Sequence, residues 1–578
     1  MKLFLSIIIT SMFFMACGGN SDSSENQKHI VKVRLLEDAD QLNPINSRNE
    51  TAKIIIDNMF QTLVNTDRRN YSIVPVLAKS RPKVFIDSLG RMIMDFEIKE
   101  EAVWPNGSKV TAKDVEFSVK VVKNPFTNCH ARKPYLEFVS DIEVDANNPK
   151  KFRVISDEPY HLGETAMDAL YILPEYFYDE KGLMKSFAIR DFEGDSLKEN
   201  VDIIEYGRHF NSELFQRERF CGSGAYQFDK WLTNQKISII KKKNWWGDQF
   251  MENHMYFEAH PEEIQFIMIP DMNTAIAALK QGKIDVMRRI SLREFVEVLP
   301  KKPMITENFE FLSPAKFSYD YIGFNCKSEI LKDKDLRVAL SQMVNVEQVI
   351  DKLCYGLAER TVGFIHPAKK SFYNGDLELH QFNLEKLNKD LDSLGWSEKN
   401  SAGIRQKIID SEKKTLTLTH IFPSSSLPRK NHAIVLKDYA SKVGIELNIV
   451  GLETSIFLQR LSQRDFDMYQ SGWITGPGES DPKQIWHTSS IEFGSNYVGY
   501  GSAYSDSIID VLRTTMDYDK RAQLYRDLQK DIYEQAPYVF MMCVNERLLI
   551  SNKFSNIYGT AVRPGFWTAS LRRNWLKN

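Results

Sequence analysis

The stretch from Thr415 to Ile449 constrains the fold most strongly, because its hydrophobic period changes twice. Apolar and polar residues alternate from Thr415 to Phe422, helical spacing follows from Ala433 to Val443, and alternation returns after Gly444. A period of two is typical of a strand and a period of about 3.6 of a helix, and glycine readily ends a helix. The stretch therefore predicts a strand–helix–strand unit, which indicates an α/β fold with partly parallel sheets.

Other segments predict further elements of both kinds. A strand is expected over Ile30 to Leu36, a helix over Thr51 to Leu63 and a hairpin over Val84 to Ile98. Asp271 is a candidate cap for a helix that Gly282 closes. A chain of 578 residues can form roughly two to four domains, so we expect more than one lobe.

The first residues resemble a bacterial lipoprotein signal. Lys2 precedes an apolar run of about 14 residues, too short to span a bilayer, and the run ends at Ala16-Cys17. The pattern implies cleavage before Cys17 and lipidation of that residue, followed by a polar tether. A plain secretory signal with an incidental cysteine is the alternative. We therefore expect a lipid-anchored protein of the cell envelope, held to the extracytoplasmic or periplasmic face of a membrane.

Charge and composition exclude several classes of protein. Lys and Arg number 75 against 77 Asp and Glu, so the net charge of −2 offers no basic field for nucleic acid. Aromatic residues make up 12%, which fits either a large core or an aromatic-lined cavity. The five cysteines after Cys17 are widely spaced without a CxxC pair, and the 11 histidines lack metal-ligand spacing. We expect no metal site and no cofactor.

Short catalytic signatures are missing as well. The sequence contains no GxSxG elbow, no Walker loop and no dinucleotide-binding GxGxxG after a strand. A pair of carboxylates for glycoside hydrolysis stays open, because such partners need not be neighbours in sequence. The pattern favours a binding protein over an enzyme.

Several segments, in order along the chain, resemble the solute-binding proteins of peptide and nickel ABC importers (solute-binding family 5). The matching segments are Leu42-Asn43-Pro44, Pro75 to Ala78, Trp104 to Val115, Gly222 to Tyr226, Lys243 to Trp246, Ala278 to Asp285, Phe324-Asn325 and Leu336 to Ser341. Met343-Val344-Asn345 departs from the family's usual Ala-Ile-Asp. Each motif alone is weak, but the series in family order is specific.

The resemblance implies a two-lobed clamshell, the type II fold of periplasmic binding proteins, with an extra domain inserted in the first lobe. The expected division is a signal peptide at 1–16, a lipidated Cys17 and tether at 17–29, a first lobe from 30–68, 200–320 and 541–578, an inserted domain at 69–199 and a second lobe at 321–540. Two strands near Tyr321 to Asn325 and Val539 to Val544 are expected to cross between the lobes. Ligand is expected between the lobes, which close over it.

The same resemblance implies a function. We expect an extracytoplasmic solute-binding component, monomeric, that captures peptides and delivers them to the permease subunits of an ABC importer. The alternatives are the same fold specialised for a nickel chelate, haem or an oligosaccharide, and a lipid-anchored hydrolase.

The site residues follow from the family's Gly-Trp-x-x-Asp segment, whose Asp binds a peptide's ammonium group. Trp473 matches the Trp and is expected to line the cleft, but Gly476 stands at the position of the Asp. Glu479 or Asp481 is expected to supply the charge from a shifted position, unless the amino terminus is not recognised or Asp481 only caps a helix. Further candidates are Arg429 for the peptide's carboxylate, Asn46 and Ser47 in the loop after Leu42-Asn43-Pro44, and Tyr321 at the predicted crossing. Arg429 can equally be a solvated helix start.

Overall fold

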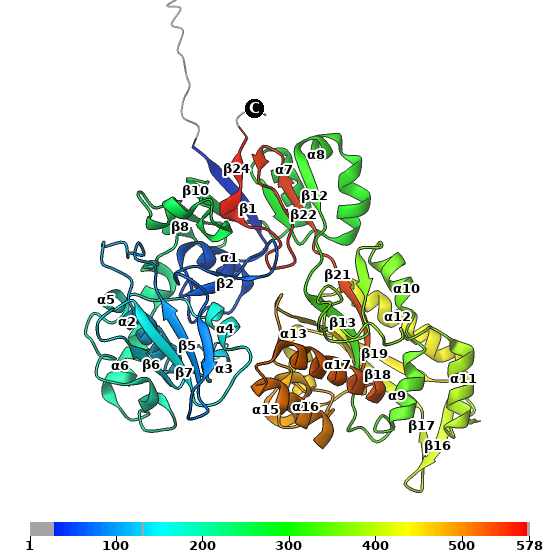
Figure 1. Ribbon diagram of the computed structural model, residues 1–578. Helices are drawn as coiled ribbons and strands as arrows, with labels where there is room; N and C mark the ends of the chain where they lie inside the picture. The colour runs from blue at the N-terminus through cyan, green and yellow to red at the C-terminus, as the bar shows by residue number, and fades with distance from the viewer. Residues whose placement is uncertain (1–27, 130–131, 575–578) are drawn as a thin grey trace, which may run out of the picture.

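The computed structural model describes residues 28–129 and 132–574, so Cys17 and the predicted signal peptide lie outside the described residues. Helices and strands alternate around two large sheets and one smaller sheet, which confirms the α/β class. Figure 1 shows the two large sheets in separate bodies of the molecule.

The first large sheet has seven strands drawn from both ends of the chain. Its order is β12 (Phe309–Leu312), β22 (Leu548–Ser551), β11 (Val286–Arg288), β1 (Ile30–Leu35), β10 (Glu263–Met268), β9 (Lys236–Lys241) and β8 (Tyr226–Leu232). β1 runs parallel to β10 and β11, whereas β22 is antiparallel to β11 and β12. The blue β1 and the red β22 of Figure 1 therefore belong to one body, which we call the first lobe. α1 (Glu50–Met59) and α7 (Met272–Lys280) also belong to the first lobe.

A smaller antiparallel sheet is inserted into the first lobe. Its strand order is β4 (Lys83–Ile86), β5 (Met92–Glu97), β7 (Lys151–Ser156) and β6 (Asp141–Val144). The Trp104 motif opens helix α2 (Ala112–Lys123): Asp114 accepts from the backbone N–H of Thr111 at 2.8 Å and from Nε1 of Trp104 at 3.2 Å. The motif is thus a helix start whose capping carboxylate also fixes a buried indole.

The second large sheet contains the strand–helix–strand unit predicted from the sequence. Its order is β14 (Ala358–Arg360), β21 (Tyr538–Val544), β13 (Ser318–Phe324), β20 (Met468–Ile474), β18 (Thr417–Pro423) and β19 (Glu446–Leu452). β18 and β19 are parallel, and α12 (Leu427–Lys442) connects them, which confirms the prediction. We call this body the second lobe.

The remaining helices range from short turns to α17, which has 18 residues. The helices are α3 (Lys133–Leu136), α4 (Gly163–Ala166), α5 (Glu175–Tyr178), α6 (Val201–Phe210), α8 (Pro303–Asn308), α9 (Lys334–Ser341), α10 (Val346–Gln348), α11 (Leu384–Ser393), α13 (Thr454–Gln463), α14 (Lys483–Trp486), α15 (Ser490–Phe493), α16 (Ala503–Thr514) and α17 (Tyr518–Gln535). The small sheets pair β2 (Val64–Thr66) with β3 (Ile73–Pro75), β15 (Glu398–Lys399) and β17 (Glu412–Thr415) with β16 (Arg405–Ile409), and β23 (Phe554–Ser555) with β24 (Arg572–Arg573).

Two short connections join the lobes, and they lie a few residues from the crossings that we predicted. They are residues 313–317, between β12 and β13, and residues 545–547, between β21 and β22. The predicted crossings fall inside the second sheet, where β13 and β21 pair with each other. β13 and β21 are almost wholly buried, so their backbone N–H and C=O groups need hydrogen-bond partners within the sheet. The chain therefore crosses between the lobes only where this pairing ends, in the connecting segments. The predicted bounds of the second lobe at 321 and 540 therefore lie within strands.

Each of the two bodies has its own apolar core. One buried cluster joins the first lobe to the inserted domain, and a second covers α7 and its neighbours in the first lobe. The second lobe has its own clusters on the two faces of its sheet. Bodies with separate cores and short connections can move relative to each other. Within the described parts of the chain, every helix is too short or too polar to cross a bilayer.

Candidate ligand-binding site

The edge of the second-lobe sheet next to the connections carries Trp473, the residue expected to line the cleft. Trp473 lies near the end of β20, opposite Tyr319 of β13. Its ring packs against the buried cluster on that face, Nε1 lies 3.5 Å from the hydroxyl of Tyr538, and the residue stays partly exposed. An aromatic ring held in this way presents a fixed surface at little entropic cost.

The loop that follows β20 is tied down at several backbone atoms. The N–H of Thr475 donates to the carbonyl of Phe317 at 2.9 Å, Lys369 Nζ donates to the carbonyl of Gly478 at 2.6 Å, and Tyr525 donates to the carbonyl of Ser480 at 2.6 Å. Gly476, at the position of the family's Asp, is exposed, and a Cβ built there would meet no atom within 4 Å. The loop is rigid but leaves open space at Gly476.

The two carboxylates expected to meet a peptide's amino terminus are both paired with arginines. Arg521 donates to the two oxygens of Glu479 at 2.7 Å each, and both side chains are mostly buried. Arg513 donates to Oδ2 of Asp481 at 2.9 Å, and Tyr160 of the inserted domain donates to the same oxygen at 3.4 Å. In this conformation each carboxylate is engaged by an arginine, and the role of either one at a peptide's amino terminus stays a prediction. α16 and α17 bring in these arginines, which the local sequence does not reveal.

Asp481 also bonds to the start of a helix, the role that its alternative interpretation gave it. Its Oδ1 accepts from the backbone N–H of Lys483 at 2.9 Å, at the start of α14. A carboxylate at this position satisfies an N–H that the helix leaves without a partner.

Arg429, the candidate for the peptide's carboxylate, is paired within the second lobe. Its Nη2 and Nε donate to Oδ1 of Asp320 at 2.7 and 3.2 Å, and each side chain is about one-fifth exposed. A Cβ on Gly472 would lie only 3.1 Å from Nη2 of Arg429, so a glycine makes room for the guanidinium. The ion pair lies at the start of α12, and its charge is compensated.

Tyr321 and Asn46 are structural in this conformation. Tyr321 is buried, its ring stacks on Tyr538 with centroids 3.8 Å apart, and its hydroxyl lies 3.1 Å from that of Tyr469. Asn46 is also buried and donates from Nδ2 to Asn211 at 2.8 Å. Both side chains face packed protein because the strand pleat and the loop turn them inward, and their role at the ligand site stays a prediction.

Ser47 does line an open cavity of about 380 Å³ on the first lobe. Three groups of residues form the wall. They are Ser47 to Glu50 with Lys53, Ile54 and Asp57 at and before α1, Arg132, Tyr135 and Ala169 of the inserted domain, and Arg563-Pro564 near the carboxyl terminus. Three segments far apart in sequence therefore build it. We call it the basic cavity, because Arg48, Lys53, Arg132 and Arg563 contribute to its wall.

Lys316 links the basic cavity to the second lobe. This residue belongs to the connection 313–317, and burial together with the charge of Arg563 lowers the pKa of its ammonium group, while Glu546, Glu50 and Asp320 oppose that shift. Glu50 and Arg563 line the basic cavity, and Asp320 lies on β13. The basic cavity and the Arg429–Asp320 pair thus lie on either side of one connection.

The inserted domain also touches the second lobe directly. His161 donates from its backbone N–H to the carbonyl of Arg513 at 2.9 Å, and its Nε2 lies 3.2 Å from the hydroxyl of Tyr525. The guanidinium of Arg513 lies over the ring of Tyr160, 5.6 Å from its centroid. A cavity of about 300 Å³ lies beside this contact, lined by both bodies.

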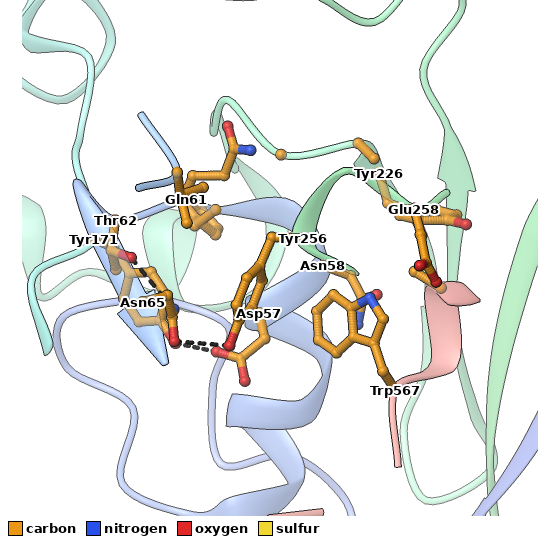
Figure 2. A pocket seen from close by; sticks show the side chains of 15 residues that line it. Asp57, Asn58, Gln61, Thr62, Asn65, Tyr171, Tyr226, Tyr256, Glu258 and Trp567 are labelled. Carbon is orange, nitrogen blue, oxygen red and sulfur yellow. Dashed lines mark hydrogen bonds between the residues drawn. The ribbon is translucent and has the colours of Figure 1, made fainter. Parts of the chain in front are cut away.

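A smaller cavity inside the first lobe is drawn in Figure 2. Asp57, Tyr171, Tyr256 and Trp567 surround a volume of about 20 Å³, close to that of one water molecule. It is too small for a peptide. Its relevance lies in Asp57, which lines both this cavity and the basic cavity, and which accepts from the hydroxyl of Tyr171 at 2.5 Å.

No sequence motif indicated Lys53, Arg132, Arg563 or Asp320 as members of a site. They come from α1, the inserted domain, the carboxyl-terminal segment and β13, and no motif connects them. Their proximity depends on the packing of the inserted domain against the first lobe.

Comparison with known proteins identifies the family. The sequence model of the bacterial extracellular solute-binding proteins, family 5, matches residues 72–494. The chain belongs to this family. The resemblance proposed from the sequence motifs is thereby confirmed.

Individual members of the family match nearly the whole chain. The oligopeptide-binding protein AppA of Bacillus subtilis is 24% identical over 589 residues, covering 99% of this chain and 97% of AppA. The solved structure of AppA with a nonapeptide has a TM-score of 0.70 at 22% identity, covering 95% of this chain and 99% of that chain. NikZ from Campylobacter jejuni, solved with Ni(L-His), has a TM-score of 0.69 at 23% identity, covering 92% and 95%. The predicted two-lobed fold of type II periplasmic binding proteins is confirmed.

Proposed function

We propose that this family member captures peptides between its two lobes, as a monomer, and delivers them to the permease subunits of an ABC importer. The similarity of almost the entire chain to an oligopeptide-binding relative carries the proposal. The geometry supports it: two bodies with largely separate cores, two short connections, one cavity lined by both bodies and one on the first lobe.

Within this proposal Trp473 and the open space at Gly476 belong to the peptide site on the second lobe, and Ser47 belongs to the site on the first lobe. A partly exposed indole supplies apolar contact area, and open space beside a fixed loop accommodates different side chains. We expect binding without turnover, because the family is one of solute-binding proteins.

Native mass spectrometry of the purified mature protein tests the function. We expect a monomer that carries a heterogeneous pool of short peptides, released on denaturation and identifiable by sequencing. Titration calorimetry with a peptide from that pool should then give saturable one-to-one binding. A single metal chelate, haem or oligosaccharide in place of peptides would contradict the proposal, as would a protein that binds no peptide at millimolar concentration.

We also propose that Cys17 is the lipidated amino terminus of the mature protein. The support is the short apolar run that ends at Ala16-Cys17 and the polar tether after it. Cys17→Ala should leave the membrane fraction or accumulate as an unprocessed precursor, whereas Cys129→Ala should fractionate like wild type. Fractionation with radiolabelled palmitate measures both, and a Cys17→Ala protein that is still processed, labelled and membrane-bound would refute the assignment.

A further inference from the structure

The basic cavity has more positive charge than its own acids compensate. Glu50 and Asp57 are its two acidic members, and each is shared between two cations. Glu50 is bonded to Arg288 and Arg289. Asp57 forms ion pairs with Lys53 through Oδ1 and with Arg68 through Oδ2, at 2.9 Å each. Both acids are therefore already neutralised by neighbouring side chains.

The other cations of the wall lack a carboxylate partner among the described residues. Arg132 donates only to the backbone carbonyls of Ile45 at 3.2 Å and Ala169 at 2.8 Å, and its guanidinium lies 5.0 Å from the ring centroid of Tyr171. Neither Arg48 nor Arg563 forms an ion pair within residues 28–129 and 132–574. These guanidinium groups keep hydrogen-bonding capacity for a ligand.

Acids close to the cavity do not remove this surplus. Asp168 interacts with Lys53 and Arg132, and its burial raises its pKa to about 6, so it is mostly ionised near neutral pH and compensates one of these cations, while Arg48 and Arg563 remain. Glu546 faces Lys316, which itself adds a cation beside Arg563. On the second lobe, Asp320, Glu479 and Asp481 are each paired with an arginine.

The surplus is local, because the whole chain has a net charge of −2. Charges gathered in a concave site focus the field and attract ligands of the opposite sign. Guanidinium groups in particular match the two oxygens of a carboxylate. Tyr135, which is more than half exposed, adds an aromatic wall beside them.

We propose that the basic cavity binds a carboxylate of the ligand through Arg132 and Arg563, so that the protein selects peptides rich in carboxylate groups. This inference rests on the proposed function and names its substrate class. The carboxylate is either that of a Glu or Asp side chain or that of the peptide's carboxyl terminus, and the experiment separates these two sources.

Calorimetry with matched peptides tests the inference. The probes are Ala-Glu-Ala-Glu-Ala, Ala-Gln-Ala-Gln-Ala and Ala-Lys-Ala-Lys-Ala, each with a free and an amidated carboxyl terminus. We expect the glutamate peptide to bind at least about tenfold more tightly than the glutamine peptide and the lysine peptide to bind least, with a preference that weakens as salt increases. If amidation alone weakens binding, the cavity binds the terminal carboxylate, and the selection of carboxylate-rich peptides is refuted.

Variants then assign the effect to the cavity. Arg132→Gln and Arg563→Gln should each reduce the preference for carboxylates several-fold, and the corresponding Lys variants should retain part of it. Arg153→Gln is the matched control, because Arg153 is an exposed arginine of the inserted domain. Thermal melting of each variant shows that it is folded.

Two further results would overturn the inference, and both differ from failure of the proposed function. One is equal affinity for the glutamate peptide and the amidated glutamine peptide. The other is a carboxylate preference that survives in both Gln variants. If no probe and no co-purified peptide binds wild type at all, the proposed function fails, and this inference fails with it.

Discussion

At the scale of single residues, the Glu479–Arg521 pair shows how a candidate ligand-binding group can be structural. Glu479 lies in the loop after β20. Arg521 lies in α17 and is 42 residues further along the chain than Glu479. Arg521 also donates from Nη1 to the carbonyls of Thr515 and Met516 at 3.2 and 2.6 Å. The pair holds a loop to a helix.

We expect Glu479→Gln to reduce stability more than ligand affinity. The substitution leaves the mostly buried Arg521 without its counter-charge, which should cost roughly 3 kcal/mol of unfolding free energy. The double variant Glu479→Gln/Arg521→Gln should recover part of this loss. Denaturant unfolding of wild type and the two variants measures the loss and its recovery, and a Glu479→Gln protein as stable as wild type would contradict the structural role.

His420 predicts a pH dependence of stability. It lies on β18, and its two buried ring nitrogens have no hydrogen-bond partner among residues 28–129 and 132–574. Burial, followed by the nearby His432 of α12, lowers its pKa to about 3. The unfolded chain, with a pKa near 6.5, takes up this proton first as the pH falls. Stability contributed by neutral His420 is therefore complete above about pH 6.5 and decreases progressively toward pH 3.

We expect His420→Leu to be less sensitive to acid than wild type. Between pH 6.5 and pH 5 the difference should reach roughly 2 kcal/mol, since one proton contributes about 1.4 kcal/mol per pH unit. Denaturant unfolding across this range measures it, with the exposed His209→Leu as control. Identical acid profiles for His420→Leu and wild type would show that His420 is not the group responsible.

At the scale of elements, the glycine-rich turn before β8 packs against the end of α1. Gly224 donates from its N–H to the carbonyl of Met59 at 3.0 Å. A Cβ on Gly224 would lie 2.6 Å from the carbonyl carbon of Met59 and 2.7 Å from the carbonyl oxygen of Asn58. Backbone atoms cannot yield as a flexible side chain can, so glycine is required for this contact.

Gly224→Ala should therefore destabilise the protein by roughly 1–3 kcal/mol through overpacking. Gly476→Ala is the control, because its new Cβ meets open space, and we expect a change within about 0.5 kcal/mol. Thermal or denaturant unfolding compares the two. Equal effects at the two positions would mean that the packing at α1 relaxes easily.

At the scale of the whole molecule, the contact of Tyr160 and His161 with α16 and α17 favours the conformation described here. It joins the inserted domain to the second lobe, the two bodies between which ligand is expected to bind. The hydrogen bonds involved contribute roughly 0.5–1.5 kcal/mol each. The contact thus biases the lobes toward closure.

Tyr160→Ala/His161→Ala should shift the lobes toward a more open arrangement. Peptide binding should weaken by about tenfold, because a smaller fraction of the protein molecules is in the state that binds peptide. Small-angle X-ray scattering should show a larger radius of gyration without ligand, and calorimetry should show the weaker affinity. Leu89→Ala, on an exposed turn of the same domain, is the control. An unchanged radius and affinity would remove this contact from the closing mechanism.

The sequence by itself determined the class of the fold, its family and several local structures. The strand–helix–strand unit at β18, α12 and β19 follows from residue periodicity, and the Trp104 motif follows from the capping of α2 by Asp114. These features depend on neighbours within about 35 residues, so local physical rules suffice.

Only the tertiary structure decided which charges remain available for a ligand. Glu479, Asp481 and Arg429 looked free in sequence, but partners at distances of 32 to 109 residues satisfy them. Arg132 and Arg563 carried no signal, and packing of the inserted domain against the first lobe gathers them at one cavity. A charge interacts with whatever lies within a few ångströms, and sequence distance does not measure that separation.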